Sequence, residues 1–537
     1  MKKNFKSILQ VPSKKHSLIL GTVIALALTG CTKNFEKYNT NPNALTSAQS
    51  NIIAPTAFGP MEQAIYSNYQ RAQNLSADCY SGYMQSGIDF GTQNNVTYVM
   101  NDGWNSTGFN DEYNLVMAPI HALATTTTVK TKNPEMWGVA LLIQVEAMSR
   151  VTDRFGPIPY SKVATSLVTA PYDDQQSVYQ QFFKQIDTAV TNINAYIATN
   201  PTKSSLGASD YIYGGNYTEW LKFANSLRLR LAMRIVKADA ATAQQQAEKA
   251  MADPGGLLTV PTDDAAIAQT GGRENDLHQI CGDWQNTNLN ASLQTYLVGY
   301  NDPRLAIYAT PATANAGYNL AGQYVGLRLG LTESANGNYK LYAALNTTTT
   351  FAFATPQLIM TAAEVWFLKA EAALRGWAGA GTAQTDYEQG ITTSMSQWGA
   401  NIGNYLSDAT STEAAYTDPA NSANNSPAVS TITIKWDPTA TQEQQLERII
   451  TQKWLAIFPD GQEAWSDWRR TGYPQLFTTA NNLSGGVVNS QTGARRLPYP
   501  SSEHTTNTAA YNNAITLLGG ADNAGTRLWW DVNKANF

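Results

Sequence analysis

Apolar residues recur every three or four positions over long parts of the chain, which is the period of an amphipathic α-helix. The pattern predicts helices over residues 136–151, 178–197 and 220–235. It also predicts an Ala/Gln-rich helix that ends at Pro254, and two further helices that begin at Leu358 and Leu446. Residues 155–157 (Phe-Gly-Pro) end the first helix, because proline cannot continue the hydrogen-bond ladder. Thr218 is the expected N-cap of the third.

The predicted helices form consecutive pairs with small Ala residues at contact positions. Pairs with too little apolar surface to stand alone stack into a solenoid of the tetratricopeptide type. The long tracts between them, rich in Gly, Asn and Thr, cover residues 74–110, 255–287, 311–350 and 400–430. Loops of that length carry function or wrap the scaffold. We therefore expect a mainly α fold with long irregular loops and little β structure, forming one domain over residues 51–537.

The N-terminus has the pattern of a secreted, lipid-anchored protein. A lysine-containing segment precedes an apolar run at residues 18–28, which is too short to span a bilayer comfortably. Leu28-Thr29-Gly30-Cys31 matches the bacterial lipobox, in which the cysteine is lipidated and becomes the mature N-terminus. We expect residues 1–30 to be removed as a signal peptide, Cys31 to carry the lipid and residues 31–50 to form a tether. An ordinary signal peptide with a chance cysteine is the alternative.

Composition narrows the class of protein. Apolar residues make up 43 % of the chain, as in ordinary globular proteins. The 36 Lys and Arg residues are outnumbered by 41 Asp and Glu, which excludes the basic surface expected of a nucleic-acid-binding protein. No later stretch approaches the ~18 uncharged apolar residues of a transmembrane helix. The 27 Tyr and 13 Trp supply rings either for a core or for stacking on sugars.

The sequence lacks the common motifs of catalysis and cofactor binding. It contains no H-E-x-x-H, G-x-S-x-G, P-loop or G-x-G-x-x-G motif, so we expect no enzyme and no cofactor. The histidines of the mature chain are too far apart in sequence to predict a metal site. Carboxylates such as Asp89, Asp102 or Asp283 leave a glycan hydrolase open as an alternative.

Two polar tracts that contain aromatic residues, 79–113 and 273–286, are the candidates for a ligand site. Rings stack on sugars, and carboxylate or amide groups bond their hydroxyls. The candidate ligand-binding residues are Tyr80, Tyr83, Asp89, Asn101, Asp102 and Trp104 in the first tract, and Arg273, His278, Asp283 and Trp284 in the second. Trp104 and Trp284 are the expected stacking platforms, and burial in the core is the alternative for both.

Each tract also contains one cysteine, Cys79 in the first and Cys281 in the second. Disulfides persist outside the cytoplasm, and one between these residues would pin the two tracts together. Two separate buried thiols are the alternative, and the sequence leaves both open.

A series of short motifs runs in order from the lipid cysteine to the C-terminus. They are Asn39-Thr40-Asn41-Pro42-Asn43, Asp153-Arg154-Phe155-Gly156-Pro157-Ile158-Pro159-Tyr160, Tyr172-Asp173, residues 220–230, Asn301-Asp302-Pro303-Arg304, residues 363–372, residues 450–454, residues 468–474 and residues 496–500. In this order they resemble the SusD/RagB family of outer-membrane nutrient-binding lipoproteins.

The resemblance implies a helical scaffold that captures a glycan or another nutrient at the cell surface without catalysis. It also implies a partner, a SusC-like TonB-dependent transporter, on which the lipoprotein forms a lid. Family members bind different ligands through variable loops, so no binding residue is transferred from them. One departure is that residues 32–36 contain only the acid Glu36, where surface-exposed members often carry an acidic run. Besides the glycan hydrolase, the other alternative function is that of a structural lipoprotein that binds only protein partners.

Overall fold

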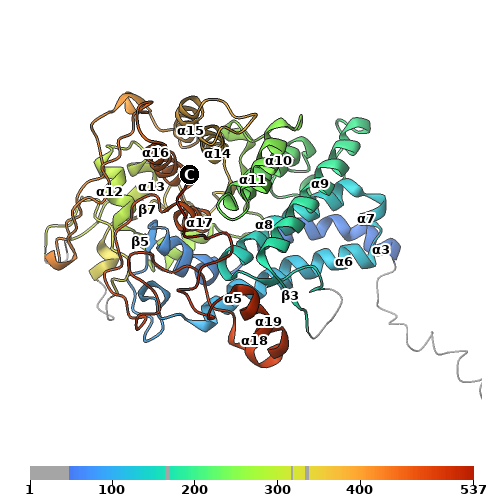
Figure 1. Ribbon diagram of the computed structural model, residues 1–537, viewed down its shortest axis with the longest axis horizontal. Coiled ribbons are helices and arrows are strands. Elements are labelled where there is room, and N and C mark those ends of the chain that lie inside the picture. Colours follow the sequence, from blue (N-terminus) through green and yellow to red (C-terminus); the bar gives the residue numbers. More distant parts are fainter. Residues whose placement is uncertain (1–46, 164–168, 316–317, 333–337) are drawn as a thin grey trace, which may run out of the picture. The chain divides into compact units, whose positions relative to one another are not determined.

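The computed structural model describes residues 47–163, 169–315, 318–332 and 338–537 (Figure 1). Residues 53–537 form one compact unit, and residues 1–52 belong to another. The predicted signal peptide, Cys31 and most of the predicted tether lie outside the described residues. Within the described residues, none of the helices is long and apolar enough to cross a membrane.

Helices make up most of the described structure. They are α3 (Ser47–Ile53), α4 (Phe58–Ala64), α5 (Asp102–Glu112), α6 (Ala118–Thr126), α7 (Val129–Lys132), α8 (Pro134–Phe155), α9 (Gln175–Thr199), α10 (Tyr217–Arg234), α11 (Ala240–Ala252), α12 (Ala291–Gly299), α13 (Leu305–Tyr308), α14 (Ala362–Leu374), α15 (Ala383–Gln397), α16 (Gln442–Ala456), α17 (Gly461–Thr471), α18 (Ser501–Thr506) and α19 (Thr508–Leu518). The less regular helical segments used below are η2 (Gln70–Asp78) and η8 (His278–Asp283).

The strands are short and pair only two at a time. They are β1 (Met84–Gln85), β2 (Ile158–Pro159), β3 (Tyr172–Asp173), β4 (Ala265–Ile267), β5 (Asn288–Leu289), β6 (Ala309–Thr310), β7 (Ala344–Leu345) and β8 (Gln357–Met360). Each pair is antiparallel, namely β1–β5, β2–β3, β4–β8 and β6–β7. The β1–β5 and β4–β8 pairs join distant segments, whereas β2–β3 closes the connection between α8 and α9 on itself.

The helical pairs expected from the periodicity are present. Helix α8 packs against α9, α10 packs against α11, and α14 packs against α15 and α16, while α10 also contacts α9 and α14 (Figure 1). Gly156 ends α8 with a φ of 93°, a left-handed conformation that glycine adopts readily, and Pro157 follows it. The mainly α fold with helical pairs, long loops and little β structure is therefore confirmed.

Three local predictions were wrong. The N-cap of α10 is Asn216, whose side chain accepts from the backbone N–H of Thr218, so the helix begins earlier than expected. Leu358 lies in β8, and α14 begins after Thr361, whose hydroxyl caps it. Residues 74–110 are not one loop, because the end of η2 and most of α5 lie within them. A polar N-cap outweighs a weak apolar repeat at such boundaries.

A network of buried ion pairs joins the helices at the centre of the body. Arg230 of α10 lies against Glu364 of α14, with Nη2–Oε2 and Nε–Oε1 distances of 2.6 and 2.8 Å. Lys453 of α16 lies 2.6 Å from Asp467 of α17. Charge-assisted bonds of this kind satisfy groups that burial would otherwise leave unpaired. The network thus fixes the helix ends on which the loops of the site rest.

Candidate functional site

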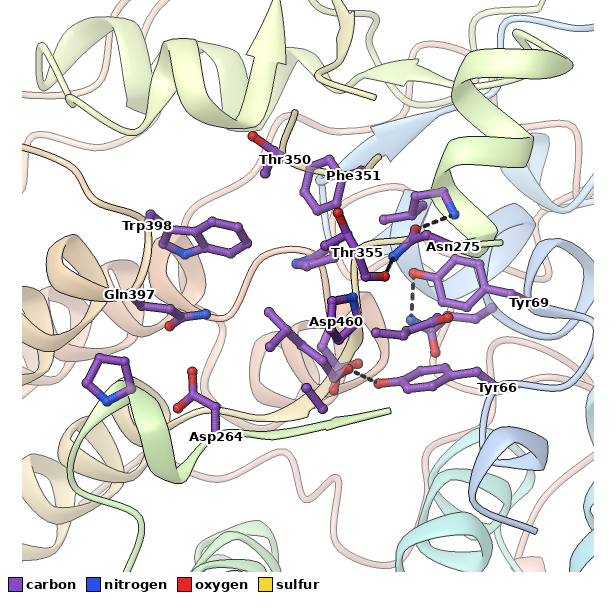
Figure 2. Close-up of a pocket in the computed structure, with 18 residues that line it drawn as sticks. Tyr66, Tyr69, Asp264, Asn275, Thr350, Phe351, Thr355, Gln397, Trp398 and Asp460 are labelled. Carbon is purple, nitrogen blue, oxygen red and sulfur yellow. Dashed lines mark hydrogen bonds between the residues drawn. The ribbon is translucent and has the colours of Figure 1, made fainter. Parts of the chain in front are cut away.

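A cavity of ≈ 310 Å³ lies where the loops return to the helical scaffold (Figure 2). Its walls come from six separate stretches of sequence: the turn after α4 with the start of η2, the β4 region, the segment before η8, residues 350–358, the end of α15, and the N-terminus of α17. The paired strands β4 and β8 close one side. Tertiary packing of distant segments therefore creates this cavity.

Aromatic rings form much of the cavity wall. Figure 2 shows Tyr66 and Tyr69 on one side, with Trp398 facing them and Phe351 between the two sides. Hydrogen bonds fix Tyr66, whose hydroxyl donates to the carbonyl of Leu358 at 2.8 Å and accepts from Arg150. Burial raises the pKa of both tyrosine hydroxyls well above the ordinary value. The rings are thus neutral, fixed surfaces on which a flat apolar face can pack.

Polar residues also line the cavity, and some of their side-chain atoms are buried without a hydrogen-bond partner. Among the described residues, the indole N–H of Trp398 and the Oε1 atoms of Gln357 and Gln397 make no hydrogen bond. Burial raises the pKa of the Asp264 carboxyl to about 7; the N–H of Ala362 donates to it and lowers the pKa, while neighbouring Asp263 raises it. Other protein atoms cover these three unpartnered atoms, so they do not face the cavity. The Asp264 carboxyl of the lining is partly protonated near neutral pH.

An exposed aromatic group adjoins the cavity wall, and we call Trp284, His278 and Phe353 the aromatic rim. Trp284 is 45 % exposed and Phe353 48 % exposed, which is unusual for such large rings. The His278 ring meets that of Phe353 edge-on, with centroids 5.9 Å apart. The carbonyl of Phe353 accepts from the backbone N–H of Asn275, a cavity residue, at 2.9 Å. The rim and the cavity wall are therefore built on the same two segments.

The second predicted tract supplies most of this rim. Trp284 and His278 belong to it, while Asp283 is exposed directly before Trp284. Arg273 lies at the other end of the tract, where it donates to the carbonyl of Gln63 and pairs with Asp276. These four residues are accessible to a ligand at least in part, and their role in binding stays a prediction.

One group in this tract has the composition of a metal site. Glu274, His278 and Asp283 each offer a ligand atom, and these atoms lie within 4.8 Å of one another. The contacts within the group already involve both oxygens of Glu274, because Gln279 donates to Oε1 and His278 Nδ1 lies 3.2 Å from Oε2. Sequence spacing did not predict this grouping, since two of its members are carboxylates and only one is a histidine.

The first predicted tract is mostly structural. Tyr80 and Tyr83 are buried, and their hydroxyls donate to backbone carbonyls of Asn95 and Trp454, respectively. Burial of both rings argues against direct contact with a ligand, and binding by Tyr80 and Tyr83 stays a prediction. They belong to the hydrophobic core, where Tyr83 stacks on the Trp454 ring.

The remaining residues of that tract have local structural roles. Asn101 caps α5 through the backbone N–H of Trp104, and Asp102 accepts from Ser501. Asp89 accepts from the N–H of Gly91 in its own turn. Trp104 is half-buried and meets Phe90 edge-on at 5.1 Å. Binding by Asp89, Asn101, Asp102 and Trp104 stays a prediction.

The two cysteines do not form a disulfide. Cys79 and Cys281 are both free and buried, which matches the alternative of two separate thiols. The Cys79 thiol donates to the carbonyl of Asn74 at 3.2 Å. Burial raises the pKa of each thiol above the ordinary value, which makes both unreactive.

Sequence reasoning missed the cavity and one of the three rim residues, Phe353. Tyr66 and Tyr69 lie in one stretch, and Phe351 and Trp398 lie in two others far along the chain, so no spacing connects the three. Phe353 is the one with a detectable signal, because it stands in a Thr-rich segment without helical periodicity.

Comparisons with known proteins identify the family. Residues 34–531 match the model of the SusD-like family, described as Susd and RagB outer membrane lipoproteins. A chitin-binding SusD homologue from Flavobacterium johnsoniae is 39 % identical, with a TM-score of 0.85 over 90 % of this chain and 100 % of that one. A SusD homologue from Bacteroides vulgatus is 36 % identical, with a TM-score of 0.84 over 90 % of this chain and 98 % of that one. No match was found among curated proteins.

The fold is thus that of a helical scaffold whose long loops enclose a cavity and display exposed rings. The chain belongs to the SusD/RagB family of outer-membrane lipoproteins, as the sequence motifs implied.

Proposed function

We propose that this protein is a cell-surface lipoprotein that captures an oligosaccharide or polysaccharide and delivers it to a SusC-like TonB-dependent transporter. The observation that carries the proposal is the aromatic rim, where Trp284 and Phe353 are about half exposed and Phe353 meets the His278 ring. Exposed rings stack on sugars, and neighbouring amide and carboxylate groups bond their hydroxyls. A relative 39 % identical over its whole length is described as chitin-binding, which supports this ligand class.

Capture on such a surface is expected to be weak for a single sugar and stronger for a chain. Each stacking contact competes with water, and only the surplus over ordering costs appears as affinity. A polymer adds several contacts at once and offers many equivalent units, which raises its effective concentration at the rim. Weak, reversible capture suits a protein that passes its ligand on.

Calorimetric titration of the mature chain, from Thr32 onward, against a panel of polysaccharides and peptides tests ligand capture. We expect binding to a glycan that Trp284→Ala and Phe353→Ala each weaken by about two- to tenfold, since an aromatic contact is worth about 0.5–1.5 kcal/mol. Leu483→Ala is the matched control, because Leu483 is an exposed apolar residue outside the rim. Trp104→Ala tests the first tract in the same assay. Glycan binding that survives both rim substitutions would remove the rim from the proposal.

The transporter and the absence of catalysis require separate tests. Extraction of the lipidated protein from its own membrane in mild detergent should recover a β-barrel transporter with it, and recovery of the lipoprotein alone counts against this partner. Prolonged incubation with the bound glycan should release no product. Product that disappears on Asp283→Asn would establish the hydrolase alternative instead.

A further inference from the structure

We infer that a second cavity, beside the C-terminal end of α17, binds an oxyanion group such as sulfate, phosphate or carboxylate, either free or carried by a small ligand. The cavity measures ≈ 280 Å³, and its walls include the end of α17, Lys237 after α10, and parts of residues 490–495 and 527–536. This cavity and the aromatic rim are lined by different residues, so the inference does not depend on the proposed function.

The lining of this second cavity is positively charged. Among the described residues that line it, six are Lys or Arg and none is Asp or Glu. The six are Lys237, Arg469, Arg470, Arg495, Arg527 and Lys534. The chain as a whole has a net charge of -5, so this grouping runs against the overall composition. A cleft lined by charges of one sign concentrates their field and attracts ions of the opposite sign.

Three of these cations are accessible at least in part. Lys534 is exposed, the Arg527 side chain is 33 % exposed, and Lys237 is half-buried. Lys237 Nζ donates to the carbonyl of Arg470 at 3.0 Å and to Oδ1 of Asn536 at 3.3 Å, and both acceptors are uncharged. An ammonium group has three donors, so its bonds to the described residues leave one for a ligand.

The three buried arginines, each at most 5 % exposed, add positive charge behind this surface. Arg469 donates to two backbone carbonyls and a serine hydroxyl, which are uncharged. Arg495 shares a single carboxylate, that of Asp531, with Arg527. Arg470, by contrast, pairs with carboxylates of α14 and α17. The lining therefore carries more positive charge than its ion pairs balance.

The pKa values of the lining agree with this excess of like charge. Burial, together with the charges of Arg470 and Arg527, lowers the pKa of Lys237 to about 8. Burial and neighbouring arginines lower the pKa of Arg469 to about 9, although two nearby carboxylates partly oppose the change. An anion bound beside such groups stabilises their charged forms.

Uncharged donors complete the lining. Gln475, Gln491, Thr492 and Asn533 are exposed residues of the wall, and their amide or hydroxyl groups can donate to oxygen. An oxyanion accepts from several donors at once and bonds most strongly to charged ones. The volume is close to the lower end of the range for small-molecule sites, about 300–1,000 Å³, so a small carrier fits together with the oxyanion.

Phosphorus NMR of the mature chain with inorganic phosphate tests this inference, with inorganic sulfate and acetate as competitors at constant ionic strength. Lys237→Met removes the charge but keeps an apolar stem, and should weaken phosphate binding by about tenfold. Lys237→Arg keeps the charge and should retain binding to within about threefold. Lys249→Met is the matched control, because Lys249 is an exposed lysine outside this cavity, and should leave binding unchanged.

A second pair of probes distinguishes a free oxyanion from one carried by a ligand. Saturation-transfer NMR compares glucose 6-sulfate with glucose, which has the same ring without the charge. Binding of the sulfate ester that exceeds binding of inorganic sulfate assigns the site to an oxyanion on a carrier. Binding of inorganic sulfate that equals or exceeds that of the ester assigns it to a small free anion. Both results support an oxyanion site, whereas equal binding of glucose and glucose 6-sulfate contradicts it.

Two other results overturn the inference. One is that the unaltered chain binds none of the oxyanions, and the other is that Lys237→Met weakens phosphate binding no more than Lys249→Met does. Trp284→Ala should leave phosphate binding unchanged, so failure of this inference is separate from failure of the rim proposal. Thermal unfolding of each variant checks that it folds. If Lys237→Met does not fold, Lys534→Met decides in its place, because Lys534 is exposed.

Discussion

Removal of Arg230 is the sharpest test of the buried ion-pair network. Its guanidinium forms a forked pair with Glu364, at 2.6 and 2.8 Å, and lies 3.3 Å from Glu146. All three side chains are at most 5 % exposed. Arg230→Met fills similar space but leaves two buried carboxylates short of a partner, which costs about 3–5 kcal/mol. Arg230→Lys should also destabilise, because an ammonium group cannot make the forked pair.

Thermal unfolding measures this loss. A body of this size has an unfolding entropy of about 1 kcal/mol/K, so Arg230→Met should lower Tm by about 3–5 °C. Lys249→Met is the matched control, because the Lys249–Asp187 pair is exposed and worth at most about 1 kcal/mol. The double variant Arg230→Met/Glu364→Leu should be less destabilised than the two single changes together. If Arg230→Met lowers Tm no more than Lys249→Met does, the network does not stabilise the fold as argued.

Three further predictions follow from individual buried groups. Burial raises the pKa of Glu413 to about 7, so the folded state holds this proton more tightly than the unfolded chain. Stability should therefore fall as pH rises from about 4.5 to about 7, and Glu413→Gln should flatten that fall when Tm is measured across this range. Gly461→Ala should lower Tm by a few degrees, since its Cβ would meet the η2 backbone at 2.5 Å; the same change at Gly103, with no contact under 3.4 Å, should not. Without reductant, Cys79 and Cys281 should react with a thiol reagent only after unfolding, and a count of zero thiols in the unfolded chain would show a disulfide instead.

Local patterns of sequence were sufficient for the scaffold. The apolar repeat at residues 136–151 and 178–197 reports which helix face is buried, and α8 and α9 pack through those faces. Gly156 and Pro157 ended α8 as expected because backbone geometry alone prevents its continuation. Cap positions were less certain: Asn216 and Thr361 compete with neighbouring residues of similar capping ability.

Local sequence patterns also predicted part of the candidate site and failed for another part. An aromatic residue flanked by polar residues and lacking helical periodicity, as at Trp284, has few places to be buried, and this ring is indeed exposed. The same local pattern surrounds Tyr80 and Tyr83, yet both are in the core because β1 and η2 pack under α16 and α17 residues. Composition of a tract does not say which of its rings other segments will cover.

By itself, the sequence determined the mainly α architecture, the family and one side of the aromatic rim, because periodicity, breakers and short motifs act over a few residues. Only the tertiary structure decided that Phe353 stands beside His278, that Trp398 faces Tyr66 and Tyr69 across a cavity, and that the two cysteines remain free. Those relations join segments tens to hundreds of residues apart. They depend on how the whole core packs, and no local pattern encodes that packing.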